Sequence, residues 1–470
     1  MASRWGFDDA ADGLRPGCPG RCYLAHPAAD LGRCLVGNSP PHQLSSNTSV
    51  AHASRSASTP RSVACGRIRG GGSAGVVQTT IAAAEAVGNR PMWERRPPLW
   101  LAAAAVAGGW AALYSIGRWL LLFALGPVHE DVLMYYAAAQ VGIRHGWSAI
   151  YNQALFGSVS PAAAEIVDLH RPFASPPLLA WLFAPLTVFP EPVAFAVWTA
   201  LSLVALVLAW RLVAPYEGLA KVALLLVAIG LWPVLLVFYF GQPTMFLIAL
   251  VAAAWWLCGH DRPATAGVVL AVATFLKPQA LLLLPVALMF SGRIRAVAGW
   301  AAGCGALGVA TVITLGPSGL SAWETALKEV QGLPVDTEYT LTHLLGTGLA
   351  TYMLWGLQGA VALGIAWAHR DRLEIVFAAG LLGTAATASY FHEADYSILL
   401  LAAWLVLRTG PPVWHRLYLL AGVIPMQLMT FGAGNLPVPL DIAVHAPQLI
   451  WNAGWLAILG LSARRARAAT

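Results

Sequence analysis

Charged residues are scarce in this chain. Of its 470 residues only 11% are Asp, Glu, Lys or Arg, while 58% are hydrophobic. Soluble globular domains usually have about a quarter charged residues, so a soluble fold is excluded for most of the chain. The net charge of +6 does not indicate nucleic-acid binding, because the excess Lys and Arg lie in an N-terminal tail and in short loops. That distribution is typical of membrane topology signals.

Cysteine is also scarce, and its spacing excludes a standard zinc module. Cys18, Cys22 and Cys34 leave a metal site or a disulfide open, but their spacing fits no standard zinc pattern. We therefore predict no metal site and no cofactor. A divalent ion is compatible with the sequence but is not required by it. Of the other three cysteines, Cys65 lies in the tail, and Cys258 and Cys304 lie in apolar runs.

The first part of the chain has no sustained apolar period and cannot build a core. We predict a disordered, basic, cytoplasmic tail over residues 1–97, a polytopic transmembrane domain over 98–463, and a second cytoplasmic tail over 464–470. Met92 precedes the charged Glu94-Arg95-Arg96 run and the first apolar run. It resembles a natural start, so part of the tail is a candidate for a misplaced gene start.

Long runs almost free of charge dominate the rest. They are exemplified by Leu101–Leu125, Pro192–Trp210, Val222–Phe240, Ala296–Leu315 and Leu344–Trp367. Runs of this length are typical of transmembrane helices. The sequence therefore predicts an all-α integral membrane protein, a polytopic bundle of about twelve transmembrane helices.

Lys and Arg near the ends of the runs set the expected orientation, with both termini in the cytoplasm. Two irregular segments make this orientation consistent. Pro176–Pro190 is short and interrupted by prolines, which favours a re-entrant element. Ala264–Phe290 is broken at Lys277-Pro278, which favours two short helices that meet at Lys277.

This topology gathers sparse polar residues on the outer side of the membrane. They come from distant segments: Glu130, Asp131, Gln242, Lys277, the Gly316–Thr342 loop, His392, Glu393, Asp395 and Asn435. Ionisable groups at such positions are costly and are functional candidates by default. Helical spacing of apolar residues also predicts two amphipathic helices flat on the outer face, one from Val132 to Ile143 and one from Ser318 to Gln331.

Several of these segments resemble a known family. Asp131-Val-Leu-Met-Tyr135-Tyr136-Ala, then Gly146, Ile150-Tyr151 and Ser175-Pro176-Pro177, resembles the opening of glycosyltransferase family 87. Three later motifs are similar as well: Phe240-Gly241-Gln242, Lys277-Pro278-Gln279 after Gly267, and His392…Asp395-Tyr396. The resemblance covers roughly residues 98–460.

The resemblance implies a membrane glycosyltransferase of the GT-C class. It implies a polyprenyl-phosphate sugar as donor, with mannose or arabinofuranose as the sugar, and a glycolipid or polysaccharide as acceptor, on the outer face of the cell membrane. It implies Asp131 as catalytic base and His392 in binding of the donor phosphate. The later motif, Tyr390 to Tyr396, departs from the tryptophan- and histidine-rich form of actinobacterial mannosyltransferases, so the sequence leaves the sugar open.

The residues themselves suit such a reaction. An ionised carboxylate can take the proton of an acceptor hydroxyl, and Asp131, with Glu130 as second choice, is the predicted base. Asp131 is also a favoured helix N-cap, which is the plain structural alternative.

For phosphate binding we predict Lys277 and His392. The alternatives are a structural ion pair of Lys277 with Asp131 or Glu393, and a satisfied interfacial histidine. Glu393 and Asp395 are predicted to orient Lys277 or bind a divalent ion. Further substrate-binding candidates are Gln242, Tyr135, Asp395 and Glu130, with Arg144, His145 and Arg171 as weaker phosphate candidates.

Two other functions stay open at this stage. A secondary transporter or lipid-sugar flippase also uses broken helices near charges, although transporter sites lie at mid-membrane between repeated halves. A non-catalytic protein of a cell-envelope assembly is the third, and its outer charges would be replaceable.

Overall fold

The computed structural model of the protein describes residues 99–125, 129–168, 171–331, 338–432 and 436–468, and every regular element within them is helical. The predicted all-α fold is therefore confirmed for this part of the chain. The predicted tail over 1–97, with its cysteines and Met92, lies outside the described residues, as does Asn435.

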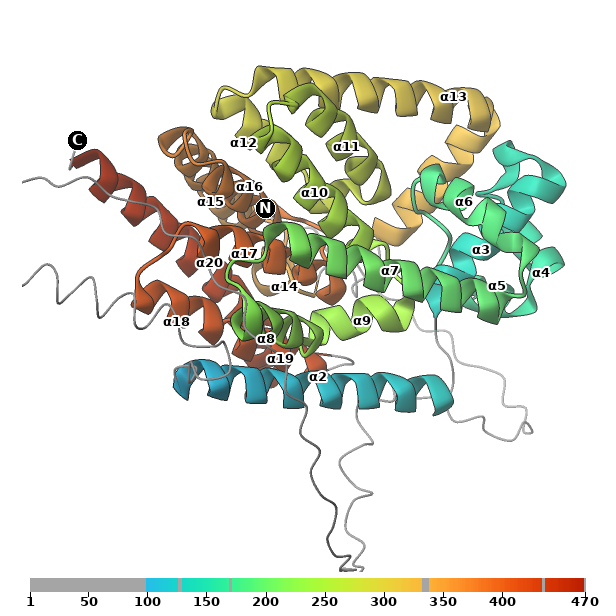
Figure 1. Cartoon of the computed structure of the whole chain (residues 1–470). Coiled ribbons are helices and arrows are strands. Elements are labelled where there is room, and N and C mark those ends of the chain that lie inside the picture. The colour runs from blue at the N-terminus through green and yellow to red at the C-terminus, as the bar shows by residue number, and fades with distance from the viewer. Residues whose placement is uncertain (1–98, 126–128, 169–170, 332–337, 433–435, 469–470) are drawn as a thin grey trace, which may run out of the picture.

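The first apolar run forms α2 (Leu99–Leu125), which lies along one side of the bundle, at the bottom of Figure 1. It packs against α8 (Gly218–Ile229). On its other side Trp110 is 70% exposed and Tyr114 is 68% exposed. A soluble monomer rarely exposes a large apolar patch, so this face of α2 suits contact with lipid.

The loop after α2 folds into short helices gathered at one end of the bundle, on the right of Figure 1. They are α3 (Glu130–His145), η1 (Trp147–Ala149), η2 (Gln153–Leu155), α4 (Phe156–Val159), α5 (Pro161–Asp168), α6 (Pro177–Phe183) and η3 (Ala184–Val188). The elements α6 and η3 fall within the predicted re-entrant segment, and together they are too short to be counted as a candidate span.

The predicted amphipathic helix at Val132–Ile143 is confirmed as a helix, but its expected position flat on a surface is wrong. Side chains on all faces of α3 are buried from Val132 to Ala139. The reason is that α4, α5, α6 and η3 pack around α3. The polar positions Arg144 and His145 fall at its exposed C-terminal end.

The centre of the bundle contains two bent segments. The first consists of α8 and α9 (Trp232–Phe240), which meet at an angle of 62°. The second consists of α11 (Pro263–Leu276), η4 (Pro278–Ala280) and α12 (Leu284–Phe290), so the predicted break at Lys277-Pro278 is confirmed. Between and around them lie α7 (Glu191–Val213) and α10 (Thr244–Gly259).

The longest helix, α13 (Ile294–Gln331), bends at Gly316, whose φ is 62°. Its first part runs along the top of Figure 1, and its second part, which includes the predicted Ser318–Gln331 helix, descends toward α3. There the Trp323 indole donates to the carbonyl of Ala174 at 2.9 Å and stacks on Tyr151. The second predicted amphipathic helix therefore covers the α3 region.

The C-terminal part is a set of helices that closes the bundle on the left of Figure 1. They are α14 (Leu341–Leu345), α15 (Leu349–Ala368), α16 (Leu373–Thr387), η6 (Glu393–Ile398), α17 (Leu399–Arg408), α18 (Val413–Ala421), α19 (Val423–Leu428), η7 (Met429–Phe431) and α20 (Val438–Ala468).

Four described helices are long and apolar enough to cross a membrane: α7, most of α13, α15 and most of α20. The bent pair of α8 and α9 raises this number to five. The predicted count of about twelve is therefore not confirmed. Several apolar runs form helices of only 10–17 residues, such as α10, α11 and α16, because turns inside the runs divide them.

Two hydrophobic clusters make up the interior of the described part of the chain. The larger joins α7 to α12 with α15, α16, α17 and α20, and the smaller surrounds α3 and includes parts of α6, α7 and the bend of α13. The two clusters meet at the start of α3 and the end of α11. Leu276, at the end of α11, belongs to the smaller cluster, while earlier residues of α11 belong to the larger one. Polar residues at the ends of these helices are thus brought to one seam.

Glycines set the close approach of α11 and α13. A Cβ on Gly299 of α13 would lie 2.1 Å from the carbonyl oxygen of Ala264, and one on Gly267 of α11 would lie 2.0 Å from that of Ala296. Small residues allow helices in membranes to pack backbone against backbone. Any larger side chain must push these two helices apart.

We expect Gly299→Ala to lower the unfolding temperature of the purified protein, because overpacking costs about 1–3 kcal/mol. Gly308→Ala on the same helix is the matched control, since its Cβ would meet open space and alanine favours helix. Thermal unfolding in detergent measures both. Equal unfolding temperatures for the two variants would show that the glycine contact does not limit packing.

Candidate active site

Four polar side chains from separate segments meet at the seam between the two hydrophobic clusters. Asp131 lies in the first turn of α3, Gln242 follows α9, Lys277 follows α11, and Asp395 lies in η6. Asp395, Lys277 and Gln242 are all buried. Buried charges are tolerated when they are paired, and each of these groups has a partner among the others.

Lys277 is the centre of this cluster. Its Nζ contacts the Asp395 carboxylate and donates to Gln242 Oε1 at 2.7 Å. The side chain is placed there because Pro278 cannot continue α11, so the chain turns at Lys277. The predicted alternative, an ion pair with Asp131 or Glu393, is corrected by the structure, because the direct ion pair is with Asp395.

Gln242 owes its position to the glycine before it. Gly241 ends α9 in the left-handed conformation, with φ of 75°, and its carbonyl accepts from the Trp198 indole at 2.7 Å. A Cβ at Gly241 would lie 2.1 Å from Val132 Cγ2. The missing side chain therefore lets α3 approach the end of α9, which brings Gln242 to Asp131.

Asp131 does not act as the cap of α3. The N-cap position is His129, and Asp131 lies inside the first turn. The side chain of Gln242 lies beside its carboxylate, which is also within electrostatic range of Lys277. The structural alternative considered from the sequence, that Asp131 merely caps the helix, does not describe this arrangement.

The environment of Asp131 changes its acidity. Burial raises the pKa of its carboxyl from 3.8 to about 6, Lys277 opposes the rise, and Glu130 adds to it. A carboxylate with this pKa is still ionised at neutral pH and is a stronger base than an exposed aspartate. Asp131 is thus suited to take a proton from a hydroxyl group.

Glu130 and Tyr135 flank Asp131 in different ways. Glu130 accepts from Arg171 at 2.5 Å, at the more exposed edge of the cluster. Tyr135 is buried between Phe173 and Phe183, with its hydroxyl near Ser175. Glu130 thus holds a basic side chain near the site, while Tyr135 packs the helix that bears Asp131.

His392 stands at the start of η6, next to the Lys277 pair. Its backbone N–H donates to Asp395 Oδ2 at 3.1 Å, and its Nε2 lies 2.9 Å from the hydroxyl of Tyr390. Burial lowers the pKa of His392 to about 4, against the effect of Asp395. The imidazole is therefore neutral at physiological pH.

Glu393 turns away from Lys277. Its carboxylate accepts from the Trp232 indole and from the Tyr339 hydroxyl, both at 2.8 Å. Burial raises the pKa of Glu393 to about 7. The predicted role of Glu393 in orienting Lys277 is thus corrected, and Asp395 alone of the two contacts the lysine.

Sequence reasoning missed the residues that hold Glu393. Trp232 lies 161 residues earlier in the chain and Tyr339 lies 54 residues earlier. Neither residue type carries a signal for this contact in the sequence, because apolar aromatic residues are abundant throughout the chain. Arg144 and His145, by contrast, lie at the exposed end of α3, and the structure gives them no contact with Lys277 or Asp395.

The arrangement combines three chemical properties. It has a half-buried carboxylate of raised pKa at Asp131, a fixed ammonium group at Lys277, and a neutral imidazole at His392. Together these groups can accept one proton and donate hydrogen bonds to an anion. These are the functional groups that a group-transfer site needs when a hydroxyl attacks and an anion leaves.

Comparison with known families agrees with this chemistry. The sequence model of glycosyltransferase family 87 matches residues 173–430. This segment contains Gln242, Lys277, His392 and Asp395, and it begins after Asp131. Comparison with curated proteins and with solved structures found no significant match. The family match spans more than half of the chain, so this protein belongs to glycosyltransferase family 87, a family of membrane glycosyltransferases.

Proposed function

We propose that the protein transfers a sugar from a polyprenyl-phosphate donor to a hydroxyl of a lipid or polysaccharide acceptor at the outer face of the cell membrane. The sugar is a hexose such as mannose or a pentose such as arabinofuranose. The observation that carries the proposal is the half-buried carboxylate of Asp131, which lies beside the buried Lys277 and Gln242. The protein also exposes apolar helix faces that suit contact with lipid.

The proposed step is a single displacement. Asp131 takes the proton of the acceptor hydroxyl while the acceptor oxygen forms a bond to the anomeric carbon. The bond between that carbon and the phosphate oxygen breaks at the same time, and the polyprenyl phosphate leaves with the electron pair. One displacement inverts the configuration at the anomeric carbon.

The charges of the site support this assignment. Asp131 and Asp395 share the single ammonium of Lys277, so the three groups carry one excess negative charge when Asp131 is ionised. Proton uptake removes that excess as the leaving phosphate gains negative charge. Lys277 and the imidazole N–H of His392 are the proposed donors to the phosphate, with Arg171 at the more exposed edge.

An apolar groove supports a lipid-linked substrate. Its volume is about 470 Å³, and it lies between α14, α15, α16 and α20. Its lining is aliphatic except for Gln358 and Asn452. Ligand pockets typically measure about 300–1,000 Å³. We propose that this groove holds part of an isoprenoid or acyl chain.

The first test compares Asp131→Asn with wild type in membranes supplied with a panel of radiolabelled polyprenyl-phosphate sugars. We expect transfer to endogenous lipid acceptors to fall about 10²–10⁴-fold in the variant, which is the usual contribution of a positioned base. Asp261→Asn, in an exposed turn, is the control at equal expression. If Asp131→Asn transfers sugar as well as wild type does, Asp131 is not the base. If wild type transfers no sugar from a broad panel, the transporter alternative is favoured.

The pH dependence should follow Asp131. The base acts only when ionised, and its pKa is raised to about 6, so the rate should be constant above about pH 7 and fall about tenfold per pH unit well below pH 6. The measurement is kcat/KM for the donor between pH 5 and 8, buffered at constant ionic strength. A rate that does not change down to pH 5 would contradict the assignment.

A pair of variants separates binding by Lys277 from its structural role. Lys277→Met leaves Asp395 buried without its cation, so we expect both a lower unfolding temperature and loss of transfer, since breaking a buried pair costs about 3–5 kcal/mol. The double variant Lys277→Met with Asp395→Leu should recover much of the unfolding temperature but not the transfer. Recovery of both would mean that Lys277 is structural only.

A further inference from the structure

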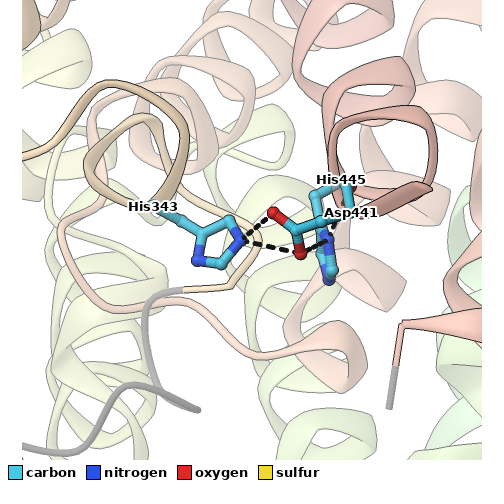
Figure 2. A group of neighbouring side chains, drawn as sticks. All are labelled: His343, Asp441 and His445. Atoms are coloured by element: carbon cyan, nitrogen blue, oxygen red, sulfur yellow. Dashed lines mark hydrogen bonds and ion pairs between the residues drawn. The ribbon is translucent and has the colours of Figure 1, made fainter. Parts of the chain in front are cut away.

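Three side chains able to bind a metal ion meet at the N-terminal end of α20. Asp441 and His445 lie one helical turn apart, and His343 comes from α14, 98 residues before Asp441. Figure 2 shows the His343 ring facing the Asp441 carboxylate, with His445 on the other side of it. The candidate ligand atoms of the three residues all lie within 4.8 Å of one another.

We propose that His343, Asp441 and His445 bind a divalent first-row transition metal ion, of which Zn²⁺ is the type best suited. Two imidazole nitrogens and one carboxylate are a donor set that Zn²⁺ accepts with a fourth position left open. Ca²⁺ and Mg²⁺ prefer sites made of oxygen atoms. The spacing of residues in the sequence predicted no metal site, because His343 lies 98 residues before Asp441.

The distances are close to those that a metal needs. One carboxylate oxygen, Asp441 Oδ1, lies 3.2 Å from His343 Nε2 and 3.0 Å from His445 Nδ1. Ligand atoms at about 2.1 Å from a tetrahedral Zn²⁺ are about 3.4 Å apart. The two carboxylate contacts therefore need to lengthen by only a few tenths of an ångström. His343 lies on a helix of five residues followed by Gly346, which makes that movement easy.

The surroundings also suit a cation. His445 is buried, whereas His343 and Asp441 are each about a quarter exposed, so one side of the group is open to water or a further ligand. The carboxylate supplies a negative charge between the two imidazoles. Without a metal, the Asp441 carboxylate accepts hydrogen bonds from both rings, and the backbone carbonyl of Asp441 lies 2.9 Å from His445 Nδ1. This hydrogen-bonded triad is the competing interpretation.

Such an ion would brace the segment behind the proposed active site. The His445 ring packs on Tyr339 with ring centres 4.7 Å apart, and the Tyr339 hydroxyl donates to Glu393. Tyr396 in turn donates to the carbonyl of Tyr339 at 2.9 Å. The metal therefore holds α14 against α20 and, through Tyr339, supports the η6 turn that bears Asp395. It does not contact Asp131, and its binding does not rest on the proposed transfer reaction.

The test is metal binding by the full-length protein, purified in detergent through a tag without histidine and stripped with a chelator. Calorimetric titration with Zn²⁺ alone should show that wild type binds one equivalent of the ion. In His343→Gln and in Asp441→Asn this binding should be lost, or its affinity should be at least tenfold weaker. His260→Gln is the matched control, because His260 is exposed on a distant turn. Zn²⁺ should also raise the unfolding temperature of wild type and of the control, but not that of His343→Gln.

A second probe is Co²⁺, whose visible absorption reports four-coordinate nitrogen and oxygen ligands. We expect the bands in wild type and in His260→Gln and their loss in His343→Gln. His343 is partly exposed, so this variant should fold even if Asp441→Asn does not. Equal Zn²⁺ affinity in wild type and His343→Gln, or no binding by wild type, would overturn the metal site and leave a hydrogen-bonded triad. Neither readout involves sugar transfer, so this failure is distinguishable from failure of the proposed function.

Discussion

A lysine buried in an apolar bundle must keep its charge compensated, and in this protein that requirement determines which segments meet. The Nζ of Lys277 contacts Asp395 and Gln242. An unpaired ammonium in such surroundings would be costly. The turn after α11, the end of α9 and the η6 turn must therefore assemble together. Asp131, at the start of α3, completes the group through Gln242.

The same compensation gives the site its chemistry. Loss of water around Asp131 raises the pKa of its carboxyl to about 6, Lys277 opposes the rise, and Asp395, which shares that ammonium, adds a little to it. A carboxylate in this state accepts a proton readily while it is still ionised at neutral pH. The structural need to pair Lys277 and the proposed transfer of a proton to Asp131 are thus two consequences of one arrangement.

The η6 turn is supported from both sides. On one side Asp395 holds Lys277, and on the other Glu393 accepts from Trp232 and Tyr339. Tyr339 continues this support to His445 and so to the proposed metal ligands on α14 and α20. The apolar groove beside α14 is bordered by the same two helices. The proposed lipid site and the proposed metal site therefore depend on how α14 sits against α20.

The sequence by itself determined the helical class, the membrane character, the break at Lys277-Pro278 and the family. Apolar composition determines which segments are membrane-like helices, and a proline determines where a helix breaks, without reference to distant segments. The sequence also indicated Asp131, Gln242, Lys277, His392 and Asp395 as a group, because polar residues are rare in apolar surroundings and so stand out. The count of about twelve spans was not confirmed, since apolar runs do not reveal where turns divide them.

Only the tertiary structure decided which partner each charge takes. Asp395, not Asp131 or Glu393, pairs directly with Lys277, and His343 meets Asp441 across 98 residues. The burial of α3 was decided in the same way, because helices that follow it in the chain pack around it. Contacts between distant segments depend on how helices pack. Helix packing depends on small residues such as Gly241 and Gly299, and the sequence does not show which residues lie against them.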